Sequence, residues 1–458
     1  MDWHALLIRH VIAPLWARWE QSNYLLHYRT LRRTQFDKES VIKERQWQRL
    51  QALLKHAGTT VPYYRDLFAR AQIDCTHVKR DDFQRIPILQ KADIQTQADR
   101  LLSSKYRKRD LILKRTSGST GTAISVWIDE ESRQWKRACT LRSDEWSGWR
   151  LGEPVALVWG NPEYLKRGWR GRFRNALLDR QTYLDTLALT ASSLEHFANR
   201  LAGRRPSLLF GHAHSIYLLA DFIRSHGSPA VRPRGIITTA MILHDWQRRT
   251  IEAVFDCPVT NRYGCEEVSL IACECEQHRG LHVNADGVFV ELVTNGRSAR
   301  PGEPGAVIVT DLTNRAMPLI RYRVGDVAAW SVEQCPCGRG LPLLDRLEGR
   351  EADYVVTRNG TLISGISLTE NLALGVPGAA QVQIVQETVS HFRFRLVRGP
   401  DFGPASLTRL RHLVDMRLGS DVSFECEYLD RIPCEPSGKY RFCISHVPKT
   451  LVAEDTRA

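Results

Sequence analysis

The sequence predicts an α/β protein with a large N-terminal domain and a small α+β C-terminal domain. The large domain is expected to start with helices and to continue as layered α/β sheets with a β meander. Three observations predict this: helix-period apolar residues up to about residue 105, alternating strand-like and helix-like runs from about 110 to 345, and a new pattern after residue 349. The predicted divisions are 1–105, 106–348 and 349–458.

Residues 1–105 are predicted to be mostly helical. The segment 45–56 places Trp47, Leu50 and Leu54 on one helix face. Pro62 then breaks this helix and begins another.

The core, 106–348, is predicted to contain a largely parallel sheet. Apolar β-rich runs at 155–159, 208–210 and 235–239 are separated by helix-like segments, which is the pattern of α/β layers. The runs expected to form a hairpin or meander are 287–293 and 305–310, and the elements expected in the small unit are strands at 381–385, 392–396 and 423–428 and a helix at 407–418.

The composition indicates a protein with a sizeable core. The chain has 458 residues, of which 43% are hydrophobic, and a formal net charge of +13. Lysine and arginine are spread along the chain, which favours an enzyme for anionic small molecules over a nucleic-acid-binding protein. No apolar run approaches the roughly 20 residues that span a bilayer, no signal peptide is recognised, and the 11 cysteines are scattered. We therefore expect a cytoplasmic protein without nucleic-acid partners and leave its oligomeric state open.

The stretch 115–122 reads RTSGSTGT, and apart from Arg115 it consists of hydroxyl side chains and glycines. Glycines let the backbone turn and expose N–H groups, and hydroxyls add donors, so the loop could hold phosphate oxygens. It is not a Walker A loop, because the Gly-Lys-Ser/Thr ending is missing. Taken alone, a plain surface turn explains it better.

Two further stretches pair a glycine with a carboxylate. In 261–267, Tyr263 can stack on a purine and Glu267 can hold a Mg²⁺ that bridges phosphates. In 318–326, a buried run ends in Gly-Asp, and Asp326 at a strand end can accept hydrogen bonds from two ribose hydroxyls. Solvated turn acids are the alternative for both.

Two basic residues lie at the small C-terminal unit. Arg350 stands where the composition changes, and Lys439 stands on a Ser-Gly turn. A mobile lysine can meet charge that develops on a phosphate, although most such residues are only solvated.

The order of these five motifs resembles the adenylate-forming superfamily. From about residue 45 onward the chain is similar to the phenylacetate–coenzyme A ligase branch and, within it, to the CapK-like group associated with capsular polysaccharide. The phrases VPYYR at 61–65, GLH at 280–282 and CPCGR at 335–339 carry this finer resemblance.

The resemblance implies a two-step reaction. A carboxylate attacks the α-phosphate of ATP to give an acyl-adenylate and pyrophosphate, and a thiol, typically coenzyme A, then displaces AMP. The small C-terminal domain would be mobile and would rotate between the two steps. By match to the family motifs, the site residues are Thr116, Ser117, Gly118, Ser119, Thr120, Gly121 and Thr122 at the β- and γ-phosphates, Tyr263 and Gly264 at adenine, Glu267 at Mg²⁺, Asp326 at the ribose with Arg350 assisting, and Lys439 at the charge of the adenylation step.

Two positions depart from the family pattern. Ala352 stands where an acidic hinge residue is usual, and Ala123 stands where proline is common after the loop. Adenylation followed by transfer to a carrier protein or a sugar amine is an alternative, because the acceptor surface leaves no short signature. A non-catalytic zinc-containing assembly protein in surface-polysaccharide production is a further alternative, which the altered hinge alone supports.

Cysteine and histidine residues also form a candidate zinc site. Paired cysteines on a Pro/Gly knuckle together with Cys and His elsewhere suit tetrahedral zinc, and members of the resembled branch carry a similar pattern. Four filled positions would make the site structural. The expected ligands are Cys275, His282, Cys335 and Cys337, with His278 or Cys273 able to replace one of them, and buried thiols with a core histidine are the alternative.

The resembled branch places its acyl-substrate wall at Phe210, His212 and Ala240. Aromatic and apolar side chains there would suit an aryl or apolar acid. A core or helix-start histidine is the simpler interpretation of His212. At the other end of the chain, segment 3–19 interleaves Trp, Leu and Ile with Arg and His. It could dock on an anionic membrane, but packing on its own domain is favoured.

Overall fold

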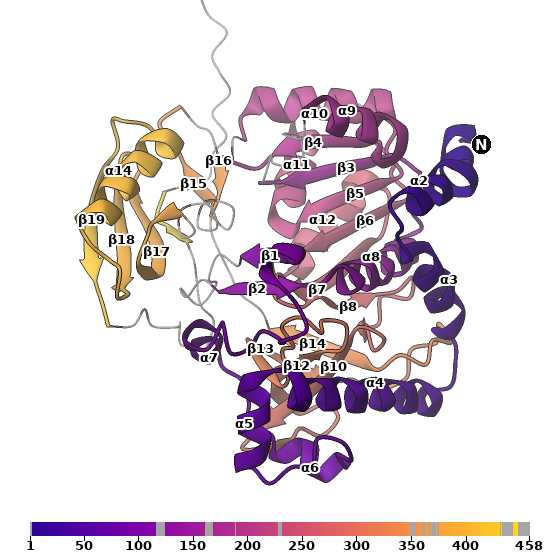
Figure 1. Cartoon of the computed structure of the whole chain (residues 1–458). Coiled ribbons are helices and arrows are strands. Elements are labelled where there is room, and N and C mark those ends of the chain that lie inside the picture. Colours follow the sequence, from indigo (N-terminus) through magenta and orange to yellow (C-terminus); the bar gives the residue numbers. More distant parts are fainter. Residues whose placement is uncertain are drawn as a thin grey trace, which may run out of the picture.

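The structure, a computed structural model of the whole chain, describes residues 2–115, 124–160, 168–187, 189–227, 231–348, 354–359, 362–365, 368, 372, 375–430, 432 and 443–447. Figure 1 shows a large body built around one long sheet, with a smaller unit at its side. This arrangement confirms the predicted fold class. In the described part of the chain, no helix is both long enough and apolar enough to cross a membrane.

The helical start predicted for the large domain is present. Pro62 begins a new helix directly after the long helix that ends at Thr60. Trp47, Leu50 and Leu54 are all buried, on the face that packs against the antiparallel part of the sheet. The helices of this part are α1 (Trp3–Leu7), the π-helical turn Ile8–Ile12, α2 (Ala13–Trp19), α3 (Tyr24–Thr34), α4 (Glu39–Thr60), α5 (Pro62–Arg70), α6 (Arg80–Arg85) and α7 (Lys91–Thr96).

One mixed sheet of twelve strands runs through the large domain. From edge to edge its strands are β11 (Arg297–Ser298), β10 (Val288–Thr294), β12 (Pro304–Asp311), β13 (Tyr322–Trp330), β14 (Leu343–Glu348), β9 (Leu281–Val283), β8 (Ser269–Glu274), β7 (Val259–Cys265), β6 (Gly235–Thr239), β5 (Leu208–His212), β3 (Val155–Trp159) and β4 (Gln181–Asp185). The strands from β7 to β4 pair in parallel, as predicted, and the others pair antiparallel. β7 joins the two parts, because it is parallel to β6 and antiparallel to β8.

Side chains that alternate along the parallel strands fill two core layers. Ala156, Val158 and Ile236 pack in the layer formed with α10, α11 and α12, whereas Val155 and Ile237 pack in the layer formed with α2, α3 and α8. The sheet is therefore covered by helices on both faces at its parallel end. The α-helices described after residue 105 in this domain are α8 (Glu130–Asp144), α9 (Gly168–Arg174), α10 (Ala191–Arg204), α11 (Ala213–His226) and α12 (Asp245–Phe255).

The small C-terminal unit has the predicted α+β character. Its sheet has the order β19-β18-β17-β20, and the helix and strands predicted from the sequence are all present. Val356 and Val447 pack in the core layer of α10 to α12, so this unit contacts the parallel end of the large sheet. The elements are β15 (Tyr354–Val356), β16 (Leu362–Ser364), β17 (Ala379–Thr388), β18 (His391–Arg398), α14 (Pro404–Leu418), β19 (Ser423–Tyr428) and β20 (Cys443–Ser445).

A buried ion pair fixes α8 to the sheet. The Arg142 guanidinium is fully buried and donates to Asp286 at 2.8 Å and to Asn284 at 2.5 Å. We expect Arg142→Ala to lower the free energy of unfolding by about 3–5 kcal/mol, because Asp286 stays buried without its nearest cation. Urea denaturation measures this loss.

Arg133→Ala on the same helix is the control. Its ion pair with Glu130 spans 2.7 Å between exposed side chains, so we expect a loss below about 1 kcal/mol. Equal losses in the two variants would show that burial does not determine the contribution of Arg142.

Candidate active site

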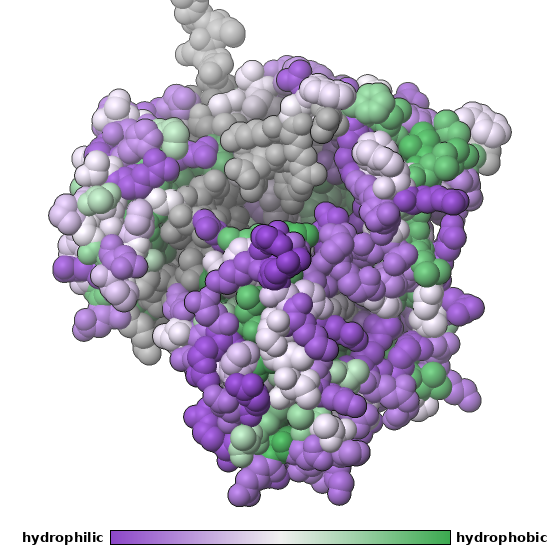
Figure 2. Space-filling view, viewed as in Figure 1, coloured by the Kyte–Doolittle hydropathy of each residue, from purple (hydrophilic) through white to green (hydrophobic). Residues whose placement is uncertain are grey.

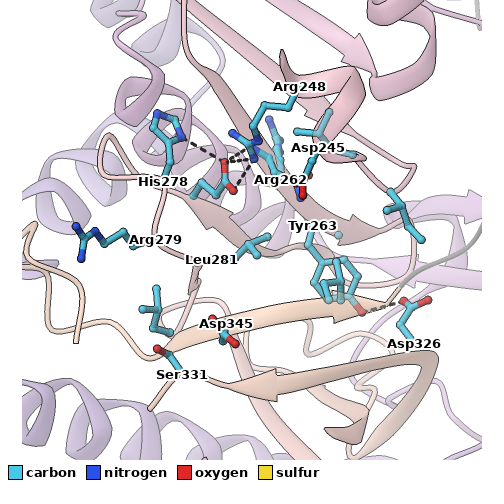
Figure 3. Close-up of a pocket in the computed structure, with 18 of the residues that line it drawn as sticks. Asp245, Arg248, Arg262, Tyr263, His278, Arg279, Leu281, Asp326, Ser331 and Asp345 are labelled. Atoms are coloured by element: carbon cyan, nitrogen blue, oxygen red, sulfur yellow. Dashed lines mark hydrogen bonds and ion pairs between the residues drawn. The ribbon is translucent and has the colours of Figure 1, made fainter. Parts of the chain in front are cut away.

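A cavity of about 930 Å³ lies where β7 joins the parallel and antiparallel parts of the sheet. Figure 3 shows its lining side chains converging from several elements. The walls come from the segment after β6, from α12, from β7 and β8, and from β13 and β14. The predicted residues Ala240, Tyr263, Gly264 and Asp326 all line it.

Tyr263 and Asp326 meet in this cavity, although 63 positions separate them in the chain. The Tyr263 hydroxyl donates to Oδ2 of Asp326 at 2.8 Å, and both side chains are buried. Gly264 follows Tyr263 on β7, where an added Cβ would lie only 2.5 Å from the Ser269 carbonyl oxygen. Glycine is therefore required for β7 to approach β8 this closely.

Asp326 lies inside β13, so its prediction as a strand-end residue is wrong. The register of β12 and β13 shifts at this point: Ile308 opposes Arg323, while Ala306 opposes Val327. Gly325 has φ +98°, which L side chains rarely adopt, and it allows the strand to bulge and continue. The bulge aims Asp326 into the cavity. A glycine inside a strand pattern was the signal for it.

Glu267 is buried just beyond the cavity. The Tyr322 hydroxyl donates to its Oε1 at 3.1 Å, and the Lys91 ammonium lies 3.7 Å from the same oxygen. Glu267 is not among the cavity-lining residues that the structure describes. Lys91 begins α7, and sequence reasoning missed it because nothing in the spacing connects it with Glu267.

The donor-rich loop 116–122 lies outside the described residues, as do Ala123, Arg350, Ala352 and Lys439, but the base of the loop is described. Two antiparallel strands, β1 (Ile112–Arg115) and β2 (Ser125–Ile128), flank it, which confirms the predicted strand–loop–strand context. Lys114 on β1 pairs with Glu266 at 2.8 Å. The loop therefore starts next to the turn that carries Glu267.

An ion-pair network that sequence reasoning missed forms another wall of the cavity. The Arg248 guanidinium donates to both oxygens of Glu274, at 2.8 and 3.0 Å, and His278 lies 3.3 Å from the same carboxylate (Figure 3). The backbone N–H of Asn261 also donates to Glu274, at 2.7 Å. The network holds α12, β7 and β8 together, and no spacing in the sequence reveals it.

Phe210 and His212 stand one strand away from the cavity. They belong to β5, and among the described lining residues only Ala240 represents the predicted acyl wall. Phe210 stacks on Trp159 with ring centroids 5.6 Å apart, and the His212 ring lies 4.1 Å from Trp159. Burial lowers the pKa of His212 to about 4, so its ring is neutral at pH 7.

The four predicted metal ligands come together in space. The donor atoms of Cys275, His282, Cys335 and Cys337 all lie within 4.8 Å of one another. Sγ of Cys275 is 3.6 Å from Sγ of Cys335, and Sγ of Cys337 is 3.2 Å from Nε2 of His282. Backbone N–H groups two residues on donate to Cys275 and Cys337 at 3.4 Å, as in thiolate knuckles. Three thiols and one imidazole are a donor set that tetrahedral zinc selects.

The surroundings of the cluster suit metal ligation. The other ring nitrogen of His282 lies 3.2 Å from the Leu341 carbonyl oxygen, which orients the ring. Burial lowers the pKa of His282 to about 4, which leaves the ring neutral at pH 7. Burial alone would raise the pKa of Cys337. Hydrogen bonds, chiefly from Arg339, outweigh this effect and lower the pKa of the thiol below its usual value, which favours the thiolate. The described donor group contains neither Cys273 nor His278.

Comparisons with known proteins agree with this architecture. Residues 355–446 match the CapK C-terminal domain family. The chain is 24% identical to CapK of Staphylococcus aureus over 418 residues, which covers 88% of this chain and 89% of that protein. It is 25% identical to the phenylacetate–coenzyme A ligase of Thermus thermophilus over 324 residues, which covers 68% of this chain and 71% of that protein.

Solved structures of CoA ligases are also similar to this chain. The crystal structure of a 2-hydroxyisobutyryl-CoA ligase in complex with 2-HIB-AMP and CoA matches with a TM-score of 0.59 and 22% identity, over 88% of this chain and 90% of that chain. A second state of that ligase, with R3-HIB-AMP, matches with a TM-score of 0.56. The chain therefore has the fold of adenylate-forming CoA ligases, and the family resemblance read from its motifs is confirmed.

The Arg248–Glu274 pair gives a testable prediction about this site. We expect Arg248→Met to lower the free energy of unfolding by about 3 kcal/mol, because the largely buried Glu274 loses its bidentate partner. Chemical denaturation measures the loss. Arg249→Met, at the exposed next position of α12, is the control and should change stability by less than about 0.5 kcal/mol. A similar loss in both variants would mean that general effects on the helix dominate.

Proposed function

We propose that this chain, a distant homologue of CapK and of the phenylacetate–coenzyme A ligases, is an AMP-forming acid–thiol ligase. Its carboxylic acid substrate would attack the α-phosphate of ATP and release pyrophosphate, and the thiol of coenzyme A would then displace AMP to give a thioester. The observation that carries this proposal is the meeting of Tyr263 and Asp326 in one cavity beside the base of the donor-rich loop.

The described residues support a division of roles in the cavity. Asp326 offers carboxylate oxygens to two ribose hydroxyls, and its bond from Tyr263 fixes the orientation of both groups. The Tyr263 ring would lie against adenine, and Gly264 beside it lets β7 pack closely on β8, which holds this ring in the cavity wall. The loop Thr116 to Thr122 would hold the β- and γ-phosphates with its hydroxyl and backbone donors.

Glu267 has the chemistry to hold Mg²⁺, because this ion is bound through one or two carboxylates together with substrate phosphates. Tyr322 and Lys91 hold its carboxylate in place, next to the turn where Glu266 meets the loop base. When bound, the ion would neutralise phosphate charge. Lys91 would balance the negative charge of the buried Glu267 carboxylate.

The small C-terminal unit would supply the remaining groups. We assign Lys439 to the charge that develops in adenylation and Arg350 to the ribose, as their motifs imply. A cation on a mobile unit can leave the site before the thiol enters, so one cavity serves both steps. Ala240, which lines the cavity, would form the wall for the acid together with Phe210 and His212 of β5, which an acid would have to reach beyond the described lining. The stacked rings of Phe210 and Trp159 favour an aryl or apolar substrate.

We also propose a structural zinc ion held by Cys275, His282, Cys335 and Cys337. The donor types, their convergence within 4.8 Å and the oriented His282 ring support it. The ion would crosslink the end of β8 to the segment between β13 and β14. A place in surface-polysaccharide production stays a prediction that rests on the CapK resemblance.

Separate assays of the two half-reactions test the ligase proposal. We expect acid-dependent pyrophosphate release from ATP across a panel of aryl and aliphatic acids, and Lys439→Ala should slow it at least about 100-fold. Thioester formation from preformed adenylate should change by less than about fivefold, because the lysine is withdrawn in that step.

Arg409→Ala, at an exposed position of α14 in the same unit, is the matched control and should affect neither half-reaction. Absence of pyrophosphate release with every acid would contradict the ligase proposal. Equal losses in both half-reactions for Lys439→Ala would contradict the role given to that lysine.

Metal analysis tests the zinc proposal. Elemental analysis of the purified chain should find about one zinc per molecule, and Cys337→Ser should lose most of it and lower the Tm, because one of four ligands is removed. Cys426→Ser on β19, outside the donor group, should keep its zinc. Equal zinc content in the two variants would place the metal elsewhere or make it adventitious.

A further inference from the structure

Exposed apolar side chains are concentrated at one corner of the molecule. Seven of the fifteen large hydrophobic residues exposed in the described part of the chain lie between Trp3 and Trp19 or in α9. Figure 2 shows a green cluster at the upper right, where Figure 1 places the N-terminal helices. We call five of them the apolar stripe, and α9 adds Trp169 and Phe173. The stripe residues are Trp3, Leu7, Val11, Leu15 and Trp19, with exposures of 75%, 50%, 44%, 63% and 75%.

The stripe repeats every fourth residue and is held nearly straight by the helix geometry. On an α-helix a four-residue step advances about 40° around the axis, so a long repeat of this kind would wind away from one side. The π-helical turn Ile8–Ile12 lies between α1 and α2. It has more residues per turn than an α-helix, so it offsets part of the rotation of the repeat around the helix axis. The five side chains therefore present one edge about 24 Å long.

The opposite face of these helices is fixed to the large domain. Ala5, Ile8, Ala13 and Ala17 are buried. Gly152 lies against them with φ +92°, and an added Cβ there would be 2.8 Å from the Ala5 carbonyl oxygen. The predicted packing of this segment on its own domain is therefore observed, and it leaves the apolar stripe facing outward.

The helix α9 extends this surface. The Arg174 guanidinium pairs with Glu20 at 3.1 Å and lies 5.4 Å from the Trp16 ring centroid, so α9 is next to α2. Trp169 and Phe173 on α9 are 73% and 54% exposed. Two neighbouring helices thus both carry exposed apolar side chains.

The unbalanced charge around the stripe is cationic. Arg18 in α2 and Arg172 in α9 are both exposed. The two acidic residues at the helix ends are already engaged: Asp2 accepts from Ala5 N–H at 3.0 Å and from Arg180 at 2.6 Å, and Glu20 pairs with Arg174. An exposed apolar edge with basic flanks is the arrangement by which amphipathic helices bind anionic lipid surfaces.

We propose that the apolar stripe and α9 dock this chain on an anionic bilayer surface, with the helices lying in the head-group region. The tryptophans at both ends of the stripe suit that depth, since indole rings prefer the membrane–water interface. A second copy of the chain fits less well. In a two-fold antiparallel pairing of the stripe, the basic flank of one copy would face the same basic flank of the other.

Vesicle flotation of the full chain tests this proposal. We expect the chain to float with phosphatidylcholine vesicles that contain about one quarter phosphatidylglycerol, and to bind vesicles of phosphatidylcholine alone at least about tenfold more weakly. Leu7→Ser with Leu15→Ser should reduce binding to the anionic vesicles at least about tenfold. Both residues are exposed, and circular dichroism verifies that the variant keeps its fold.

Leu407→Ser with Met416→Ser, two exposed apolar positions of α14, is the matched control and should bind like the unmodified chain. Failure of the unmodified chain to bind anionic vesicles would overturn the proposal, and so would equal loss in both double variants. A concentration-dependent dimer, seen by light scattering and lost only with the Leu7 and Leu15 substitutions, would also overturn it, because the stripe would then be an interface between copies. Pyrophosphate release in solution should be unchanged in both variants, so this test is independent of the ligase proposal.

Discussion

The pairing of β7 with β8 is the constraint on which the site depends. β7 is held in parallel by β6 and turns back antiparallel into β8, so the two halves of the twelve-stranded sheet meet there. The pairing requires a glycine at 264, where any Cβ would collide with the Ser269 carbonyl. β7 delivers Tyr263 to the cavity, β8 delivers Glu274, and the chain then reaches Cys275. The nucleotide end of the proposed site and the Cys/His donor group are thus consequences of one strand junction.

The Cys/His donor group and the cavity are connected through the chain itself. Arg279, Gly280 and Leu281 line the cavity and lead directly into His282, while the lining segment 331–334 leads directly into Cys335. Any ion that ties these ligands together would also hold the two cavity walls that precede them. A structural metal can therefore matter for catalysis without touching substrate, because it fixes the distance between walls that come from different strands.

Much of the architecture could be predicted because it is local. The spacing of apolar residues, a proline at a helix start and short β-rich runs depend only on residues that are neighbours in the sequence. Strands such as β3, β6 and β19 accordingly form where these patterns predict them. The convergence of Cys275, His282, Cys335 and Cys337 could be predicted because paired cysteines together with histidine are the donor types of tetrahedral metal sites. The ion pairs of Lys91 with Glu267 and of Arg248 with Glu274 could not be predicted, because nothing in the sequence around a common charged residue indicates which residue it will contact. The place of Asp326 inside β13 is harder to predict: Gly325 signals an irregular strand, but whether the strand continues past it depends on pairing with β12.

The location of the apolar stripe bears on how the molecule would work on a surface. Figure 1 places the N-terminal helices at one side of the large domain and the unit that contains α14 at the other. A chain docked through the stripe would therefore keep its small C-terminal unit away from the bilayer. The close contact at Gly152 packs the N-terminal helix against the large domain, so a docked chain would take its orientation from the membrane plane. Adenylation would then take place beside a lipid surface, which is where an acid or acceptor that partitions into membranes is most concentrated.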